Sequence, residues 1–143
     1  MMNLRFIKVG LFLLLVSAGF SSNAQDKGSE ITKSIFFGGG SYYIDDEQAS
    51  DLSRWLDSIP NLLQKYEIQL ISHTDNIGGK RYNQWLSEMR SQMVHGLLIQ
   101  KDIPETMIHV KDWGLENPVY TNETYKGLIL NRRVDVVLHP IVF

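Results

Sequence analysis

The chain contains no cysteine among its 143 residues. Disulfides, thiolate metal ligands and thiol nucleophiles are therefore excluded, and so is a lipid anchor on a cysteine. A secreted domain without disulfides must be held together by its apolar core alone. Hydrophobic residues make up 43% of the chain, which is enough for one domain with a real core.

Positive charge is also scarce. The formal net charge is −2, and no basic run is longer than a pair, such as Arg132 and Arg133. A nucleic-acid or anionic-membrane partner is therefore not expected, because such partners are bound through dense positive charge.

Catalytic and metal-binding patterns are missing as well. No serine lies in a G-x-S-x-G context, and no histidines have H-x-x-x-H spacing. His73 and Asp75 are two residues apart and could form a metal or general-base pair, but isolated neighbours of this kind are mostly structural. The sequence predicts neither an enzyme, nor a metal site, nor a cofactor.

Long apolar runs are confined to the N-terminus. Residues 9–20 are mostly apolar, Arg5 and Lys8 precede them, and a small-x-small motif follows at residues 22–24. The run is shorter than the ~20 residues that a membrane span needs. We predict a cleaved secretory signal at 1–24, a flexible lead-in at 25–33 and one domain at 34–143. The alternative, an uncleaved N-terminal anchor, would tether the same domain in the same compartment.

Hydrophobic periodicity predicts strands alternating with helices, in the order β-α-β-α-β-β. The segment 122–130 is ambiguous between a short helix and irregular structure. Such an order favours an α+β fold, a two-layer sandwich with the helices on one face of a mixed sheet. The predicted strands are 34–37, 67–72, 107–113 and 132–141, and the predicted helices lie between 45 and 60 and over 80–100.

The end of the second strand is the most informative stretch. Asp75 follows this strand directly, and Asn76 and Gly78 turn the chain into the long helix. Asn83 and Arg90 are seven residues apart and share one edge of that helix, so the guanidinium can reach back toward Asp75. We predict both at the rim of the core. The expected apolar stripe is Trp85, Leu86, Met89, Met93, Gly96 and Leu97, and the expected solvated face is Gln84, Glu88, Ser91, Gln92 and His95.

Four motifs occur in order over roughly residues 35–138. They are 72–78 (SHTDNIG), 83–90 (NQWLSEMR), 114–118 (GLENP) and 131–134 (NRRV). Together they resemble the OmpA-like peptidoglycan-binding domain, which reads roughly G-H-T-D-x-x-G, N-x-x-L-S-x-x-R, G-x-x-x-P and N-R-R-V. That family has the fold predicted above.

The resemblance implies non-covalent binding of peptidoglycan through the meso-diaminopimelate of its peptide stem, in the periplasm. Asp75 can accept from the ligand ammonium and Arg90 can hold its carboxylate. The other implied contacts are Asn83, with Thr74 and Asn76 at the rim, and a second cation from Arg132 or Arg133. Strand alternation allows only one of these two arginines to face the pocket, and the resemblance favours Arg132.

Two alternatives stay open. Asp75 and Arg90 can simply pair and tie the helix to the strand. The domain can also have lost wall binding and instead dock onto an outer-membrane or envelope-complex protein. The glycines at 38–40 motivate the second alternative, because they replace polar residues usual in the family and either admit a close neighbour or form a plain turn. Trp113 either packs at the rim or stacks on a sugar ring.

Overall fold

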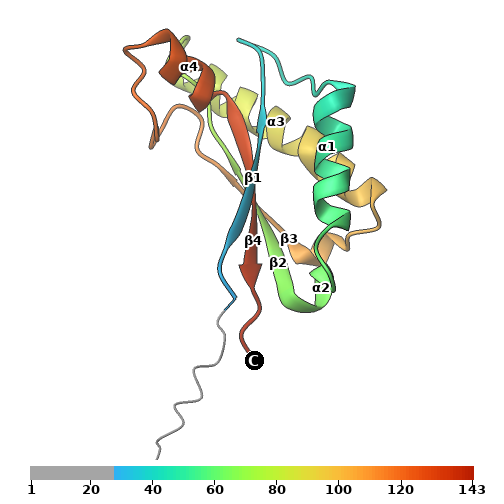
Figure 1. Cartoon of the computed structure of the whole chain (residues 1–143). Coiled ribbons are helices and arrows are strands. Elements are labelled where there is room, and N and C mark those ends of the chain that lie inside the picture. Colours follow the sequence, from blue (N-terminus) through green and yellow to red (C-terminus); the bar gives the residue numbers. More distant parts are fainter. Residues whose placement is uncertain (1–27) are drawn as a thin grey trace, which may run out of the picture.

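The computed structural model describes residues 28–143, so the predicted signal segment at 1–24 lies outside the described part. Figure 1 shows a sheet with two long helices packed against it and a short helix, α4, near one end. The described part is an α+β two-layer sandwich, as predicted. Its elements are β1 (Ile31–Phe36), α1 (Asp46–Asp57), α2 (Leu62–Lys65), β2 (Tyr66–Ser72), α3 (Lys80–Gln100), a 3-10 turn (Glu105–Met107), β3 (Ile108–Asp112), α4 (Tyr125–Asn131) and β4 (Arg133–Pro140).

The four strands form one mixed sheet in the order β1-β4-β2-β3. The last strand, β4, lies inside the sheet and pairs antiparallel with both β1 and β2. β2 and β3 are parallel, so α3 serves as the crossover between them. The register pairs Ser72 of β2 with Val134 of β4, which fixes the residues that meet at this end of the sheet.

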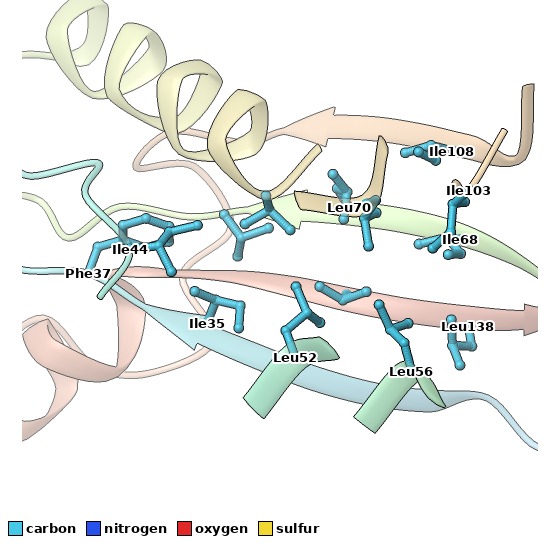
Figure 2. Packing of buried hydrophobic residues seen from close by; sticks show 14 residues of the cluster. Ile35, Phe37, Ile44, Leu52, Leu56, Ile68, Leu70, Ile103, Ile108 and Leu138 are labelled. Atoms are coloured by element: carbon cyan, nitrogen blue, oxygen red, sulfur yellow. The ribbon is translucent and has the colours of Figure 1, made fainter. Parts of the chain in front are cut away.

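The core fills the space between the sheet and the two long helices. Leu52 and Leu56 point from α1 toward the strands in Figure 2. Val94 and Leu98 cover the sheet from α3. Burying each such side chain contributes about 1.5–3 kcal/mol. The strand residues of this core are Ile35, Ile68, Leu70, Ile108, Val134, Val136 and Leu138.

The predicted elements agree with the structure apart from a few boundaries, but the short helix α2 was not predicted. β1 begins at Ile31 rather than at residue 34, because residues 31–33 pair with Val136 to Leu138 and so are not a flexible lead-in. The ambiguous segment contains α4, whose first turn is capped by the Thr124 side chain accepting from the Gly127 N–H. α1 begins after Asp45, whose carboxylate accepts from the Gln48 N–H at 2.8 Å.

The buried face of α3 is rotated from the prediction. Trp85 and Met93, expected in the core, are 45% and 40% exposed, whereas Ser91, expected in solvent, is buried. Asn83 and Arg90 are not at the rim but fully covered. These polar side chains point inward because they hydrogen-bond to backbone and side-chain groups there, which hydrophobicity alone does not reveal. The buried residues of α3 are Asn83, Leu86, Ser87, Arg90, Ser91, Val94 and Leu98.

Candidate functional site

The sheet register brings three distant segments together at one end of the sheet. Because β2 and β4 run antiparallel, the residues after Ser72 lie beside those before Val134. The His73 N–H donates to the Arg133 carbonyl at 2.8 Å, which extends this pairing beyond the strands. The end of β1 joins them, since the Phe37 N–H donates to the Arg132 carbonyl at 2.8 Å. Backbone pairing therefore places Asp75, Arg132 and the glycines at 38–40 in one neighbourhood.

Asp75 and Arg132 form an ion pair in this neighbourhood. Arg132 Nε donates to Asp75 Oδ2 at 2.5 Å, and the two side chains are 14% and 9% exposed, respectively. The other oxygen, Oδ1, accepts from the Ile77 N–H at 3.0 Å, so the carboxylate also closes the turn after β2. Each carboxylate oxygen has two acceptor positions, and both oxygens retain capacity for a further donor. The prediction that Arg132 rather than Arg133 faces Asp75 is confirmed.

Arg90 reaches the same place from α3 and uses three of its five N–H donors on backbone carbonyls. Its Nε donates to the Ser41 carbonyl at 2.9 Å, Nη1 to His73 at 3.1 Å and Nη2 to Gly38 at 3.0 Å. Burial lowers the pKa of Arg90 to about 10, an effect that Asp75 opposes and Arg132 strengthens. The guanidinium therefore stays charged at neutral pH. It ties the turn after β1 to the end of β2 and adds positive charge behind Asp75.

Asn83 and Thr74 position the site from beneath. The Asn83 Nδ2 donates to the carbonyls of Ile77 at 3.0 Å and Gly79 at 3.3 Å, so this amide holds the turn that carries Asp75. Thr74 is buried, and its N–H donates to the Gly114 carbonyl at 2.7 Å. Both side chains shape the site from the inside rather than lining its surface. Among the predicted rim residues, Asn76 is the one that is exposed.

Arg133, the other candidate for the second cation of the site, does not face Asp75. Its Nε donates to both carboxylate oxygens of Asp135 at 3.0 Å, and its guanidinium lies over the Tyr120 ring at 5.3 Å. Strand alternation turns it away from Asp75, so it cannot supply the second cation. His73 also faces Asp135, at 3.9 Å, rather than Asp75. His73 and Asp75 therefore do not form a metal or general-base pair.

The environment of His73 predicts acid sensitivity. Burial lowers its pKa below the ordinary 6.5, Arg133 adds to the effect and Asp135 opposes it. The unfolded chain then binds the proton more readily than the folded one, so stability falls as pH drops below about 6.5. We expect His73→Gln to weaken this dependence, measured as the free energy of urea unfolding between pH 7 and pH 5. Identical pH slopes in the two proteins would contradict this role of His73.

The glycines at 38–40 are close neighbours of the ion pair. A Cβ on Gly39 would lie 3.4 Å from the Arg132 guanidinium carbon, which is ordinary van der Waals contact, so the backbone here lies beside this group. Gly40 has a φ of +64°, a conformation that favours glycine. The structure supports both interpretations of this segment: the Ser41 N–H donates to the Gly38 carbonyl at 3.1 Å, which closes a turn after β1, and the same backbone lies close to a neighbour. The neighbour is Arg132.

Other features of the described residues add no chemistry to this site. No cluster of three or more histidines, cysteines or acids within residues 28–143 could hold a metal ion. A hollow of about 740 Å³ lies between α1 and α3, and neither Asp75 nor Arg132 lines it. The ion pair that lines it, Lys101 and Asp57, is 25% and 67% exposed. No helix in the described part is long and apolar enough to cross a membrane.

Comparisons with known proteins agree with the fold and with the motifs. Outer-membrane lipoprotein YfiB of Pseudomonas aeruginosa is 38% identical over 72 residues, which cover 50% of this chain and 43% of that protein. The chain thus spans less than half the length of this relative. The peptidoglycan-associated lipoprotein from Burkholderia pseudomallei superposes with a TM-score of 0.68 at 24% identity, covering 75% of this chain and 90% of that structure.

A second solved structure is the cell wall anchor of the T6SS from Pseudomonas aeruginosa. It has a TM-score of 0.64 at 26% identity, with 78% of this chain and 82% of that structure covered. The sequence model of the OmpA family matches residues 36–132, a range that includes Asp75, Asn83, Arg90 and Arg132. This match covers well over half of the chain, and it identifies a non-enzymatic domain of known fold. The chain belongs to the OmpA family.

Proposed function

We propose that this domain binds peptidoglycan non-covalently through the meso-diaminopimelate of the peptide stem and so attaches to the cell wall. The observation that carries the proposal is the ion pair of Asp75 and Arg132, with Arg90 directly behind it. These three groups comprise one carboxylate and two guanidiniums. They present both signs of charge, which is what a ligand with a carboxylate beside an ammonium requires.

Each end of the zwitterion has a partner in this arrangement. The ligand ammonium donates to the free acceptor positions of Asp75. The ligand carboxylate binds the terminal nitrogens of Arg132, because Arg132 uses Nε for its bond to Asp75. Arg90 contributes its charge from behind, while Asn83 and Thr74 hold the turn in place. Asn76 is the exposed contact at the rim.

The requirement for both charges gives the site its selectivity. A simple cation would leave the arginines unneutralised, and a simple anion would face the carboxylate of Asp75. In both cases one charge loses solvation without gaining a partner. The zwitterionic end of diaminopimelate satisfies both signs at once.

The relatives support this proposal through what their names state. One solved relative is a peptidoglycan-associated lipoprotein, another is a cell wall anchor, and a curated relative is an outer-membrane lipoprotein. We accordingly propose that the domain works in the periplasm, reached through the predicted N-terminal signal. An association with the outer membrane is part of the same proposal.

Co-sedimentation with purified diaminopimelate-containing sacculi tests the proposal. We expect the wild-type domain to pellet, free meso-diaminopimelate to compete, and Asp75→Asn or Arg132→Gln to leave the protein in the supernatant. Asparagine at 75 can still accept from the Ile77 N–H, so the turn is retained. The matched controls Asp51→Asn and Arg54→Gln remove an exposed ion pair on α1 and are expected to pellet normally.

Equal sedimentation of the site variants and the controls would refute the assignment of the site. Failure of the wild-type domain to pellet would favour the other hypothesis, an interaction domain that docks onto an envelope complex. Cross-linking in whole cells would then be expected to recover a protein partner.

A further inference from the structure

An exposed group of aromatic side chains stands beside the proposed site. Trp85 of α3 contacts the ring of Tyr42 edge-on, with centroids 6.0 Å apart, and the ring of Tyr82 at 5.9 Å. All three side chains are more than 40% exposed. We call Tyr42, Tyr82 and Trp85 the aromatic platform. It joins the segment after β1 to the first turns of α3.

The platform does little for the fold. The buried face of α3 is made by other residues, so a polar side chain at position 85 would leave the core intact. A cluster of exposed aromatic rings on a small domain marks a binding surface more often than a packing need. Trp113, the other aromatic candidate for sugar stacking, differs because the Lys111 ammonium lies 4.4 Å from its ring centroid. Trp85 and its neighbours carry no such covering charge among the described contacts.

The platform and the ion pair border the same glycine segment. A Cβ on Gly40 would lie 3.2 Å from the Tyr82 hydroxyl, and one on Gly78 would lie 3.1 Å from the Tyr82 ring. Gly39, next in the chain to Gly40, approaches the Arg132 guanidinium in the same way. The platform is thus continuous with the surface proposed to bind the peptide stem.

The chemistry of the aromatic platform and its surroundings indicates which ligand it binds. The rings offer flat, uncharged, apolar faces, while a hollow of about 550 Å³ beside Trp85 is walled by polar side chains. A pyranose ring has matching properties, with apolar C–H faces and polar hydroxyl and acetamido edges. The polar residues of that hollow are Lys80, Arg81, Gln84 and Glu88.

We infer that the aromatic platform holds a sugar ring of the peptidoglycan glycan strand while Asp75 and Arg132 hold the peptide stem. This inference rests on the proposed function, because the stem is covalently attached to the glycan. A stem of three extended residues spans about 10 Å, so binding of the stem keeps a sugar close to the protein. Even a weak stacking contact then adds to the overall affinity, since it forms within the same complex.

Calorimetric titration separates the two contributions. The ligands are a diaminopimelate stem peptide, the same peptide carried on its N-acetylglucosamine–N-acetylmuramic acid disaccharide, and the peptide-free disaccharide. We expect the wild-type domain to bind the disaccharide-peptide about tenfold more tightly than the peptide, a gain of about 1.4 kcal/mol. Trp85→Ala is expected to remove that gain and to leave the affinity for the peptide unchanged. Phe143→Ala removes an exposed aromatic ring beyond the opposite end of β4 and serves as the matched control.

The outcomes distinguish this inference from the function on which it rests. Equal wild-type affinity for peptide and disaccharide-peptide, or an equal loss of both in Trp85→Ala, would overturn the sugar contact and leave stem binding intact. If the peptide does not bind, the proposed function fails. The peptide-free disaccharide must then still shift the Trp85 indole resonance in nuclear magnetic resonance spectra for the sugar contact to stand. If the Trp85 indole resonance moves with protein concentration instead, a second copy of the chain covers the platform, and the sugar contact is overturned.

Discussion

Replacing Arg90 with alanine is expected to lower the free energy of unfolding by about 3–5 kcal/mol. The side chain is 1% exposed and bonds the carbonyls of Gly38, Ser41 and His73. Removal would leave the buried His73 carbonyl without this donor and would break the partly buried bonds to Gly38 and Ser41. It would also leave a cavity where the guanidinium packs against Phe37. Both effects lower the free energy of unfolding.

Urea unfolding followed by circular dichroism measures this loss. Arg81→Ala, which removes an exposed arginine from the same helix, is expected to change stability by less than about 0.5 kcal/mol. Arg90→Lys keeps the charge but cannot bridge three carbonyls, so it is expected to be destabilised as well. A loss below about 1 kcal/mol in Arg90→Ala would contradict the structural role. Loss of wall binding in this variant alone does not demonstrate a ligand contact.

A second large effect is expected from Gly127→Ala. A Cβ on this buried glycine of α4 would lie 1.7 Å from the Thr121 carbonyl oxygen, so the backbone itself would have to move. We expect a loss of about 2–3 kcal/mol in the free energy of unfolding. α4 leads directly into Arg132, so weaker binding to sacculi is expected to accompany the loss of stability.

Gly96→Ala is the matched comparison, measured by the same urea unfolding. Nothing lies within 4 Å of a Cβ at this position, in the C-terminal part of α3. Alanine there is expected to raise the free energy of unfolding by about 0.5–1 kcal/mol, because it is a better helix former than glycine. Replacing glycine with alanine is thus predicted to raise the free energy of unfolding in α3 and to lower it in α4. Equal effects at positions 96 and 127 would contradict the packing described for α4.

The fold was predictable because its apolar residues follow the periods of strands and helices. The alternation in β4 placed Val134, Val136 and Leu138 on one face, and all three are buried. The same alternation separated Arg132 from Arg133 and left one of them for Asp75. Charge and turn residues also marked the start of α1 and the turn after β2.

The orientation of α3 was not predictable in this way. Periodicity assigns Trp85 and Met93 to the core because they are apolar, yet Asn83, Ser87 and Arg90 take the inward positions. Arg90 is stable there because three carbonyls from segments far away in the sequence accept from it. Ser87 accepts from the Gly114 N–H, and Asn83 donates to carbonyls of the turn before α3. A pattern of single residues carries no record of such partners.

The role of Arg90 is the clearest consequence for the site. Resemblance to the family predicted a direct clamp on the ligand carboxylate, and the side chain does reach the end of β2. Three backbone carbonyls accept its hydrogen bonds, and the cation that pairs with Asp75 is Arg132, whose side chain is 14% exposed. The glycines after β1 explain this arrangement, since Gly38 supplies one of those carbonyls and Gly39 leaves room for the second guanidinium.

The most direct test is to compare two stem peptides that differ at one residue, meso-diaminopimelate in one and L-lysine in the other. The lysine peptide keeps the side-chain ammonium for Asp75 but lacks the carboxylate for Arg132. The account predicts that the diaminopimelate peptide binds the wild-type domain at least about tenfold more tightly in calorimetric titration, and that Arg132→Gln loses most of this difference. Equal affinities of the wild-type domain for the two peptides would contradict recognition of a zwitterion at this site.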